Sequence, residues 1–251
     1  MERPTTTKDI ACLLILFKRR HRLSVQCISD LLTLLPLFGV KNAPRSWYHL
    51  KRLIVATEPS HSYLFPCPHC SSASTNSSNC SNCGHHFSSN MYLNTFINFS
   101  IKDQLEIILN NNTTIDLFSS SIGDIISDIR DGNVYQQLKL ACPDRFITLT
   151  MNIDGIEIKK GSKKSIWPVL LVVNELPLNQ HYALENTIIA GIWSGPHKPS
   201  RTQMTAFLSS IVEELSQLEQ GYVFVDYRKL PNEQNTVIKV FLIGACCDKP
   251  T

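Results

Sequence analysis

The feature that most constrains this chain is a pair of Cys-x-x-Cys motifs beside a segment too polar to fold by itself. Residues 71–90 are almost entirely small and polar, and such a composition cannot bury a hydrophobic core. The four cysteines of the two motifs are Cys67, Cys70, Cys80 and Cys83. Each motif places two thiolates on one tight turn, and two such turns facing each other complete a tetrahedron around Zn²⁺. We therefore predict a zinc ribbon over residues 59–92 whose folding free energy comes from the metal.

Four thiolates leave no open coordination position, so the predicted zinc would be structural rather than catalytic. The alternative is a pair of redox or coincidental motifs. Three neighbouring histidines could substitute for a cysteine, or lie outside the ligand set or in solvent: His69, His85 and His86. The total of nine cysteines is odd and no signal peptide is evident, which favours metal over disulfides. The other five are expected to be ordinary buried thiols: Cys12, Cys27, Cys142, Cys246 and Cys247.

The first part of the chain is basic. Residues 1–60 contain ten Lys and Arg against four Asp and Glu, a net charge of +6, whereas the remaining 191 contain fourteen against seventeen, a net charge of −3. Apolar residues recur at helical spacing from Asp9 to Arg20, from Ser24 to Pro36 and from Pro44 onward. We predict a basic helical domain over residues 1–58, with a helix-turn-helix-like unit as one arrangement.

A basic domain on a nearly neutral body indicates a polyanionic partner, and DNA is the simplest one. A solvated helix face is the alternative explanation of the same composition. The side chains expected to neutralise phosphates lie on the first and third helices: Lys18, Arg19, Arg20, Arg22, Lys51 and Arg52.

No apolar run approaches the roughly 20 residues that span a bilayer, so no membrane partner is expected. The run at residues 10–17 is followed at once by KRRHR, with no small-residue cleavage site, and we interpret it as a core helix in a protein that is not secreted. KRRHR is itself a weak nuclear-localisation pattern.

After a predicted helical connector over residues 93–143, the pattern changes to strands. Residues 146–153 and 166–176 predict strands, and a further strand follows the turn at Asp154-Gly155. Residues 202–219 are the strongest helical pattern, with Gly221 at the position of a C-terminal cap, and residues 236–247 predict a last buried strand. This last domain has the order strand-strand-strand-helix-strand. Together with the basic helical domain and the zinc ribbon, it makes the predicted fold class an α+β multidomain protein.

Two acids, Asp154 and Asp248, follow the first and last of these strands. A strand-helix-strand connection favours parallel neighbours, so both carboxylates would emerge at one edge of the sheet. Carboxylates around paired divalent cations suit in-line phosphodiester chemistry. The alternative is that Asp154 is only a turn residue before Gly155. Glu213 and Glu214 lie beside the apolar stripe of the long helix and are expected to be solvated.

Residues 145–251 resemble the transposase domain of CACTA-type (En/Spm-like) DNA transposons. Enzymes of that family carry an Asp-Gly, a Ser-x-Trp-Pro, an Asn-x-Leu-Pro, a Gly-Pro-x-x-Pro turn, an apolar helix with Glu-Glu-Leu, and a second Asp after the fourth strand. The corresponding segments are Asp154-Gly155, Ser165-Ile166-Trp167-Pro168, Asn174-Glu175-Leu176-Pro177, Gly195-Pro196-His197-Lys198-Pro199, Glu213-Glu214-Leu215 and Asp248. The upstream sequence PRSWYHLKRLI followed by a Cys-x-x-Cys motif is also similar to that family.

The resemblance implies an RNase H-like fold for residues 144–251 and a nuclear enzyme that cuts transposon ends and joins them to target DNA with two Mg²⁺ or Mn²⁺ ions. Asp154 and Asp248 would be two of its three acids. The third, normally a Glu, would lie beyond residue 251, so the chain would be an incomplete catalytic domain, from a longer product or a decayed copy. DNA is the implied partner, no small-molecule substrate is implied, and self-association stays open.

A second hypothesis is a catalytically inactive, transposon-derived protein that holds DNA through the basic helices and the zinc ribbon. A third makes the ribbon a protein-interaction element without any nucleic acid.

Overall fold

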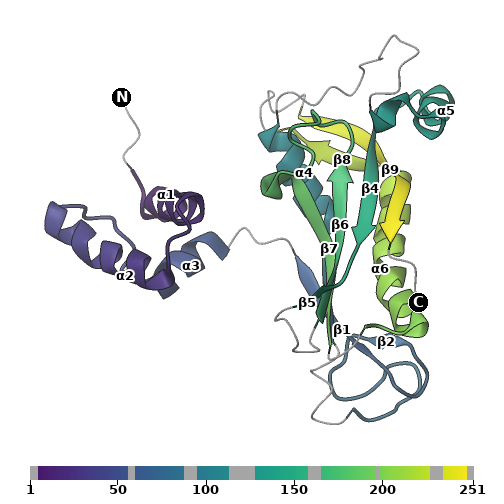
Figure 1. Ribbon diagram of the computed structural model, residues 1–251, viewed down its shortest axis with the longest axis horizontal. Helices are drawn as coiled ribbons and strands as arrows, with labels where there is room; N and C mark the ends of the chain where they lie inside the picture. Colours follow the sequence, from purple (N-terminus) through teal and green to yellow (C-terminus); the bar gives the residue numbers. More distant parts are fainter. Residues whose placement is uncertain are drawn as a thin grey trace. The chain divides into compact units, whose positions relative to one another are not determined.

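The computed structural model describes residues 5–55, 60–87, 95–112, 128–157, 165–195, 198–226 and 234–247. The chain divides into two compact units, residues 1–58 and 59–251 (Figure 1). Each unit has its own hydrophobic core.

The first unit contains three α-helices and a short 3₁₀ turn. They are α1 (Thr7–Arg20), α2 (Val25–Leu34), η1 (Leu35–Phe38) and α3 (Trp47–Val55). Their apolar stripes meet in a small core made of Ala11, Leu14, Ile28, Leu32 and Leu50. The three predicted helices are therefore confirmed.

Hydrogen bonds from side chains explain where these helices begin. Thr6 and Asp9 form a reciprocal capping box at α1, and Ser24 Oγ accepts the Cys27 N–H at the start of α2. The third helix was expected from Pro44 but begins at Trp47, where Ser46 Oγ accepts the N–H of His49. A hydroxyl that bonds the free N–H groups of the first turn sets this start.

The second unit is built on a nine-stranded mixed sheet, ordered β2-β1-β3-β7-β6-β4-β9-β8 with β5 beside β6 (Figure 1). The strands are β1 (His61–Pro66), β2 (Ala73–Ser74), β3 (Thr95–Phe99), β4 (Phe146–Ile153), β5 (Ile156–Glu157), β6 (Ser165–Val173), β7 (Thr187–Gly195), β8 (Tyr222–Val225) and β9 (Asn235–Cys247). Strands β4, β6 and β7 are antiparallel neighbours, whereas β4 and β9 are parallel. The parallel pair confirms the expected neighbourhood of the first and last strands of residues 144–251.

The helices of this unit are α4 (Ile101–Asn111), α5 (Asn133–Ala141) and α6 (Arg201–Glu219), with short 3₁₀ turns η3 (Ile129–Asp131) and η4 (Leu184–Asn186). Helices α4 and α6 share one continuous core with the sheet. Phe207 of α6 stacks on Phe96 with ring centroids 4.9 Å apart, and its ring lies so close to Gly191 that a Cβ there would be 2.8 Å away. A residue without a side chain on β7 thus lets α6 approach the sheet.

The segments expected to form a separate ribbon and a helical connector both contribute strands to this sheet. Strand β1 pairs with β3 over residues 61–64, and β3 pairs in turn with β7. Leu64 and Phe96 point into the same core as α6, and α4 adds four buried apolar residues to it. Residues 113–127 of the predicted helical connector lie outside the described residues.

Within residues 144–251, two strands were not predicted from the sequence, β7 and β8. The expected order had a single strand between Asp154-Gly155 and residue 166, whereas the structure has only the two-residue β5 in its described part. Strand β7 supplies the third long strand instead. Helix α6 and its cap match the prediction, because Gly221 adopts a positive φ of 104° directly after Gln220. Among the helices in the described ranges, none has both the length and the apolar character needed to cross a membrane.

Candidate functional site

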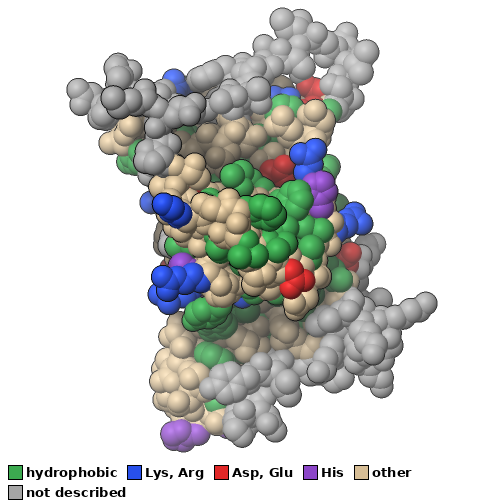
Figure 2. All heavy atoms as spheres, turned by 90° about the vertical axis from the view of Figure 1, so that its left-hand side faces the viewer, with side chains coloured by type: hydrophobic (Ala, Val, Ile, Leu, Met, Phe, Trp, Pro, Cys, Tyr) green, Lys and Arg blue, Asp and Glu red, His purple; other side chains and the backbone are tan. Residues whose placement is uncertain are grey.

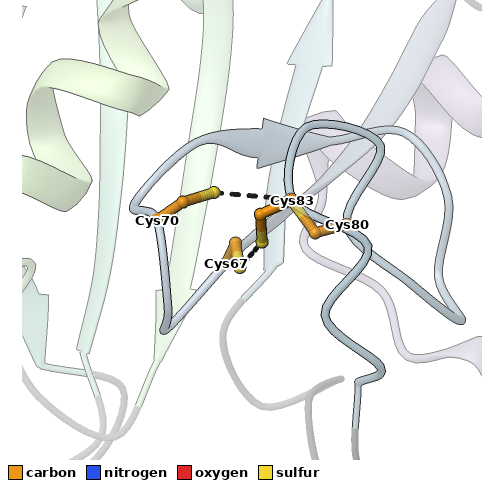
Figure 3. A group of neighbouring side chains, drawn as sticks. All are labelled: Cys67, Cys70, Cys80 and Cys83. Atoms are coloured by element: carbon orange, nitrogen blue, oxygen red, sulfur yellow. Dashed lines mark hydrogen bonds between the residues drawn. The ribbon is translucent and has the colours of Figure 1, made fainter.

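The four predicted zinc cysteines converge at the end of strand β1 (Figure 3). Their sulfur atoms all lie within 4.8 Å of one another, with Cys67 Sγ 3.6 Å from Cys83 Sγ and Cys70 Sγ 3.5 Å from Cys80 Sγ. Thiolates at roughly 2.3 Å from a tetrahedral zinc ion would have sulfur–sulfur separations of about 3.8 Å. The cluster therefore fits a closed four-thiolate site that could hold a zinc ion.

The two Cys-x-x-Cys turns have the same backbone hydrogen bonds. In the first turn the Ser71 N–H donates to the Cys67 carbonyl, and in the second the Gly84 N–H donates to the Cys80 carbonyl, both at 2.9 Å. Ser71 and Gly84 both adopt left-handed φ values, 61° and 72°. This repeated turn directs both thiols of a motif to one point, and it explains why a glycine follows Cys83.

The surroundings of the cluster shift the pKa values of two of its thiols in opposite directions. Hydrogen bonds from Ser72, and then from Asn82, lower the pKa of Cys70 to about 5. The N–H of His85 lowers the pKa of Cys83, but desolvation and the neighbouring thiols raise it to about 12 overall. Four thiols this close cannot all ionise without a cation, and a bound metal removes that repulsion. His69 and His85 stack on each other with ring centroids 5.7 Å apart, outside the four-sulfur group.

The second predicted site lies at the carboxyl end of β4. Asp154 is exposed and directly follows the buried Ile153, the last residue of the strand. Asp248 lies outside the described residues. Strand β9 ends at Cys247, which is the parallel partner of Ile153. The last described pair of the two strands therefore consists of the residues that immediately precede the two acids in the sequence.

A β-bulge sets this register. Leu149 pairs with Leu242, but the next residue, Thr150, pairs with Gly244, so that Ile243 is skipped. Without the skipped residue, Ile153 would pair with Cys246 instead of Cys247. Bulges shift the side chains of a strand relative to its neighbour and are common next to active sites.

The residue after Asp154 must be a glycine. A Cβ on Gly155 would lie 2.5 Å from the indole ring of Trp167, which is closer than any side chain tolerates. The Trp167 Nε1–H donates to Ser165 Oγ at 3.1 Å, which fixes the ring against this turn. The Trp167 ring therefore fixes the backbone beside the candidate acid.

Glu175 is a buried acid that the sequence reasoning did not single out. It is only 1% exposed, and its carboxylate accepts the N–H of Thr148 at 3.0 Å and the Thr148 hydroxyl at 2.8 Å. Desolvation raises the pKa of Glu175 to about 7, although the Thr148 hydrogen bonds lower it in part. A glutamate at the end of a β-branched run was the available signal, since an acid directly after a buried strand is costly unless it is bonded.

Glu214 was expected to be solvated and is not. Its Oε1 accepts the N–H groups of Ile101 at 2.8 Å and Lys102 at 3.0 Å, at the amino end of α4. Burial raises its pKa, and the two N–H groups lower it in part. The free N–H groups and positive dipole end of α4 stabilise this carboxylate, so Glu214 joins α6 to α4.

The predicted DNA-contacting residues lie on the surface of the first unit. Arg19, Arg20, Arg22, Lys51 and Arg52 are exposed and have no ion-pair partner within the described ranges. Lys18 is half-buried, with Nζ 5.7 Å from the centroid of the Trp47 ring, so it lies against α3.

Exposed apolar side chains share this unit, among them Leu13, Leu16, Leu37 and Phe38. Figure 2 shows a mixed face of this kind, with hydrophobic side chains near its middle and Lys and Arg side chains beside them.

Comparison with known proteins adds no relative. No protein-family model matches the chain, and no curated protein matches it.

Proposed function

We propose that residues 144–251 form the RNase H-like part of a DDE-type DNA transposase of the CACTA class, in which Asp154 and Asp248 hold divalent cations. The observation that carries this proposal is the register of β4 and β9. The bulge at Ile243 makes Ile153 the partner of Cys247, and by the same register Asp154 would be the partner of Asp248.

The order of elements supports the same proposal. Three antiparallel strands, β7, β6 and β4, are followed in space by the parallel β9, and α6 lies in the connection between β7 and β9. Ligands in sheets with parallel strands bind at the carboxyl ends of those strands. Two carboxylates at that edge can hold Mg²⁺ or Mn²⁺, of which one activates the attacking oxygen and the other stabilises the leaving oxygen of a phosphodiester.

The proposal is tested by Mn²⁺ binding to the zinc-loaded chain, followed by electron paramagnetic resonance. Asp154→Asn and Asp248→Asn should each weaken Mn²⁺ binding at least tenfold, since each removes one of the charged ligands. Asp144→Asn is the matched control: it removes an exposed carboxylate, paired with Lys239 at 2.9 Å, before the amino end of β4. Equal affinity in all four proteins would refute the proposed metal site.

The alternative is a zinc-containing DNA-binding protein without catalysis, and the exposed arginines after and within α1 favour it. Each phosphate contact that is lost should reduce the slope of log affinity against log salt by about 0.9. Neutralising Arg19, Arg20 and Arg22 together should therefore lower both the affinity for a DNA duplex and this slope. An unchanged slope would place the DNA contacts elsewhere.

A further inference from the structure

A cavity of about 240 Å³ lies beside the candidate acid edge. Its walls include Ile153 and Cys247, the residues that precede the two acids, and the first turns of α6 with Met204 and Leu208. It is smaller than the roughly 300–1,000 Å³ of pockets for drug-sized ligands, so it has room for no more than about one nucleotide unit.

Two cationic side chains line this cavity, and neither has an acidic partner among the described residues. Lys198 and Arg201 are both exposed and both line it. Arg201 is the first residue of α6, where the positive end of the helix dipole disfavours a cation. A charge placed against the local field is better explained by an anion that binds there than by the stability of the helix.

The remaining lining provides an apolar surface for a ring. Trp167 lies against the cavity with Lys198 Nζ 5.1 Å from its ring centroid, and Met204 and Leu208 are half-buried beside it. An aromatic and thioether surface next to two cations matches the two parts of a nucleotide, which are a flat base and a phosphate.

We propose that this cavity binds an unpaired nucleotide of the DNA strand next to the phosphate being cut. Lys198 and Arg201 contact its backbone phosphate, and the base lies against Trp167, Met204 and Leu208. This inference rests on the proposed function, because the neighbouring acids identify the ligand as a DNA strand; its own contacts, however, need no divalent metal.

The test uses the zinc-loaded full chain with ¹³C-labelled methionine methyl groups, and the trinucleotide d(TTT) as the probe, without added Mg²⁺ or Mn²⁺. The methyl resonance of Met204 should shift saturably, while that of Met151, which does not line this cavity, should not. Lys198→Gln and Arg201→Gln should each weaken d(TTT) binding about tenfold, the effect of losing one charged hydrogen bond to phosphate. Lys139→Gln on α5, which precedes the opposite end of β4, removes one positive charge as a control and should change nothing.

The absence of a saturable Met204 shift, or equal affinity in the Lys198→Gln/Arg201→Gln double variant, would overturn the proposal. Measuring Mn²⁺ binding of the same variants separates a failure of the nucleotide site from a failure of the proposed metal site. If the double variant changes Mn²⁺ affinity but not d(TTT) affinity, the two cations only balance the acids, and the nucleotide site is refuted. If Asp154→Asn leaves Mn²⁺ binding unchanged while d(TTT) still shifts Met204, the metal site fails and the nucleotide site stands.

Discussion

The zinc cluster and the α6 side of the sheet reach order by different means within one unit. Between Cys67 and Phe87 the buried residues are two of the four cysteines and Ser74. The core under α6 instead buries a continuous set of Leu, Ile, Val, Phe and Trp side chains from seven strands and two helices. We expect the first region to depend on a bound metal ion, whereas the second depends on burial of apolar surface.

The two regions are nevertheless joined by a single strand. Residues 61–64 of β1 pair with β3, residues 65 and 66 pair with β2, and the next residue is Cys67. The sheet therefore fixes the first cysteine, and a bound metal ion would have to order only the loops that follow it.

Removal of zinc should separate the two regions most strongly. A chelator should abolish hydrogen-exchange protection at residues 67–87 while β4, β6 and α6 keep theirs, because structural zinc supplies roughly 10–16 kcal/mol to segments that lack a core. Cys67→Ser with Cys80→Ser should reproduce this loss, and Cys12→Ser, an exposed cysteine of the first unit, should not. Protection that survives confirmed loss of zinc would show that the segment folds without metal.

The converse experiment targets the apolar core. Phe207→Ala should lower the free energy of unfolding of the sheet by about 3–5 kcal/mol, because Phe207 is fully buried against Phe96 and Gly191. Zinc stoichiometry below the unfolding transition should stay at one per chain. Val212→Ala, half-exposed on the same helix, is the control and should change stability by less than about 0.5 kcal/mol in urea titrations. Loss of zinc from folded Phe207→Ala would show that the two regions depend on one core.

Glu175 provides a test of whether a buried acid lowers the folding stability of the sheet. Its pKa of about 7 in the folded protein exceeds the value of about 4.3 for an exposed glutamate, so the folded state binds the proton more tightly. Stability should therefore fall by roughly 3 kcal/mol as pH rises from about 4.5 to 7, and level off above that range.

Glu175→Gln should flatten this dependence, since the amide stays neutral and can still accept the Thr148 N–H. The measurement is urea unfolding of both proteins between pH 5.5 and 7.5, so that zinc loss at low pH affects neither comparison. Parallel pH profiles in the two proteins would contradict the raised pKa.

The sequence was sufficient where the cause of the structure is local. The spacing of four cysteines, the stripe of α6, the glycine at residue 221 and the end of β4 just before Asp154 each depend on one short stretch of the chain. The structure agrees with the prediction at each of these places.

The features that were missed depend on residues far apart in the chain. Strand β7 contains Gly191, which weakens its strand pattern but is needed for the contact with Phe207. Glu214 is half-buried because the amino end of α4, more than 100 residues earlier, lies against it. The sequence around Glu214 on α6 does not indicate that contact.

The smallest expected effect lies within the zinc segment, in the residue that follows each Cys-x-x-Cys motif. Ser71 holds a φ of 61° where Gly84 holds 72°, and a left-handed backbone costs a residue with a side chain about 1–2 kcal/mol. Gly84→Ala should therefore weaken zinc binding several-fold, since its new Cβ would meet no atom within 4 Å and only the backbone cost remains.

Ser71→Gly should strengthen zinc binding about twofold to fivefold, because relief of that cost exceeds the added entropy of the unfolded chain by about 0.5–1 kcal/mol. Competition with a chromophoric chelator measures both affinities. Opposite signs for the two substitutions are the expected result, because the turns share one hydrogen-bond pattern. If Ser71→Gly also weakens zinc binding, the first turn depends on the serine side chain. The two turns would then be equivalent only in their backbone hydrogen bonds.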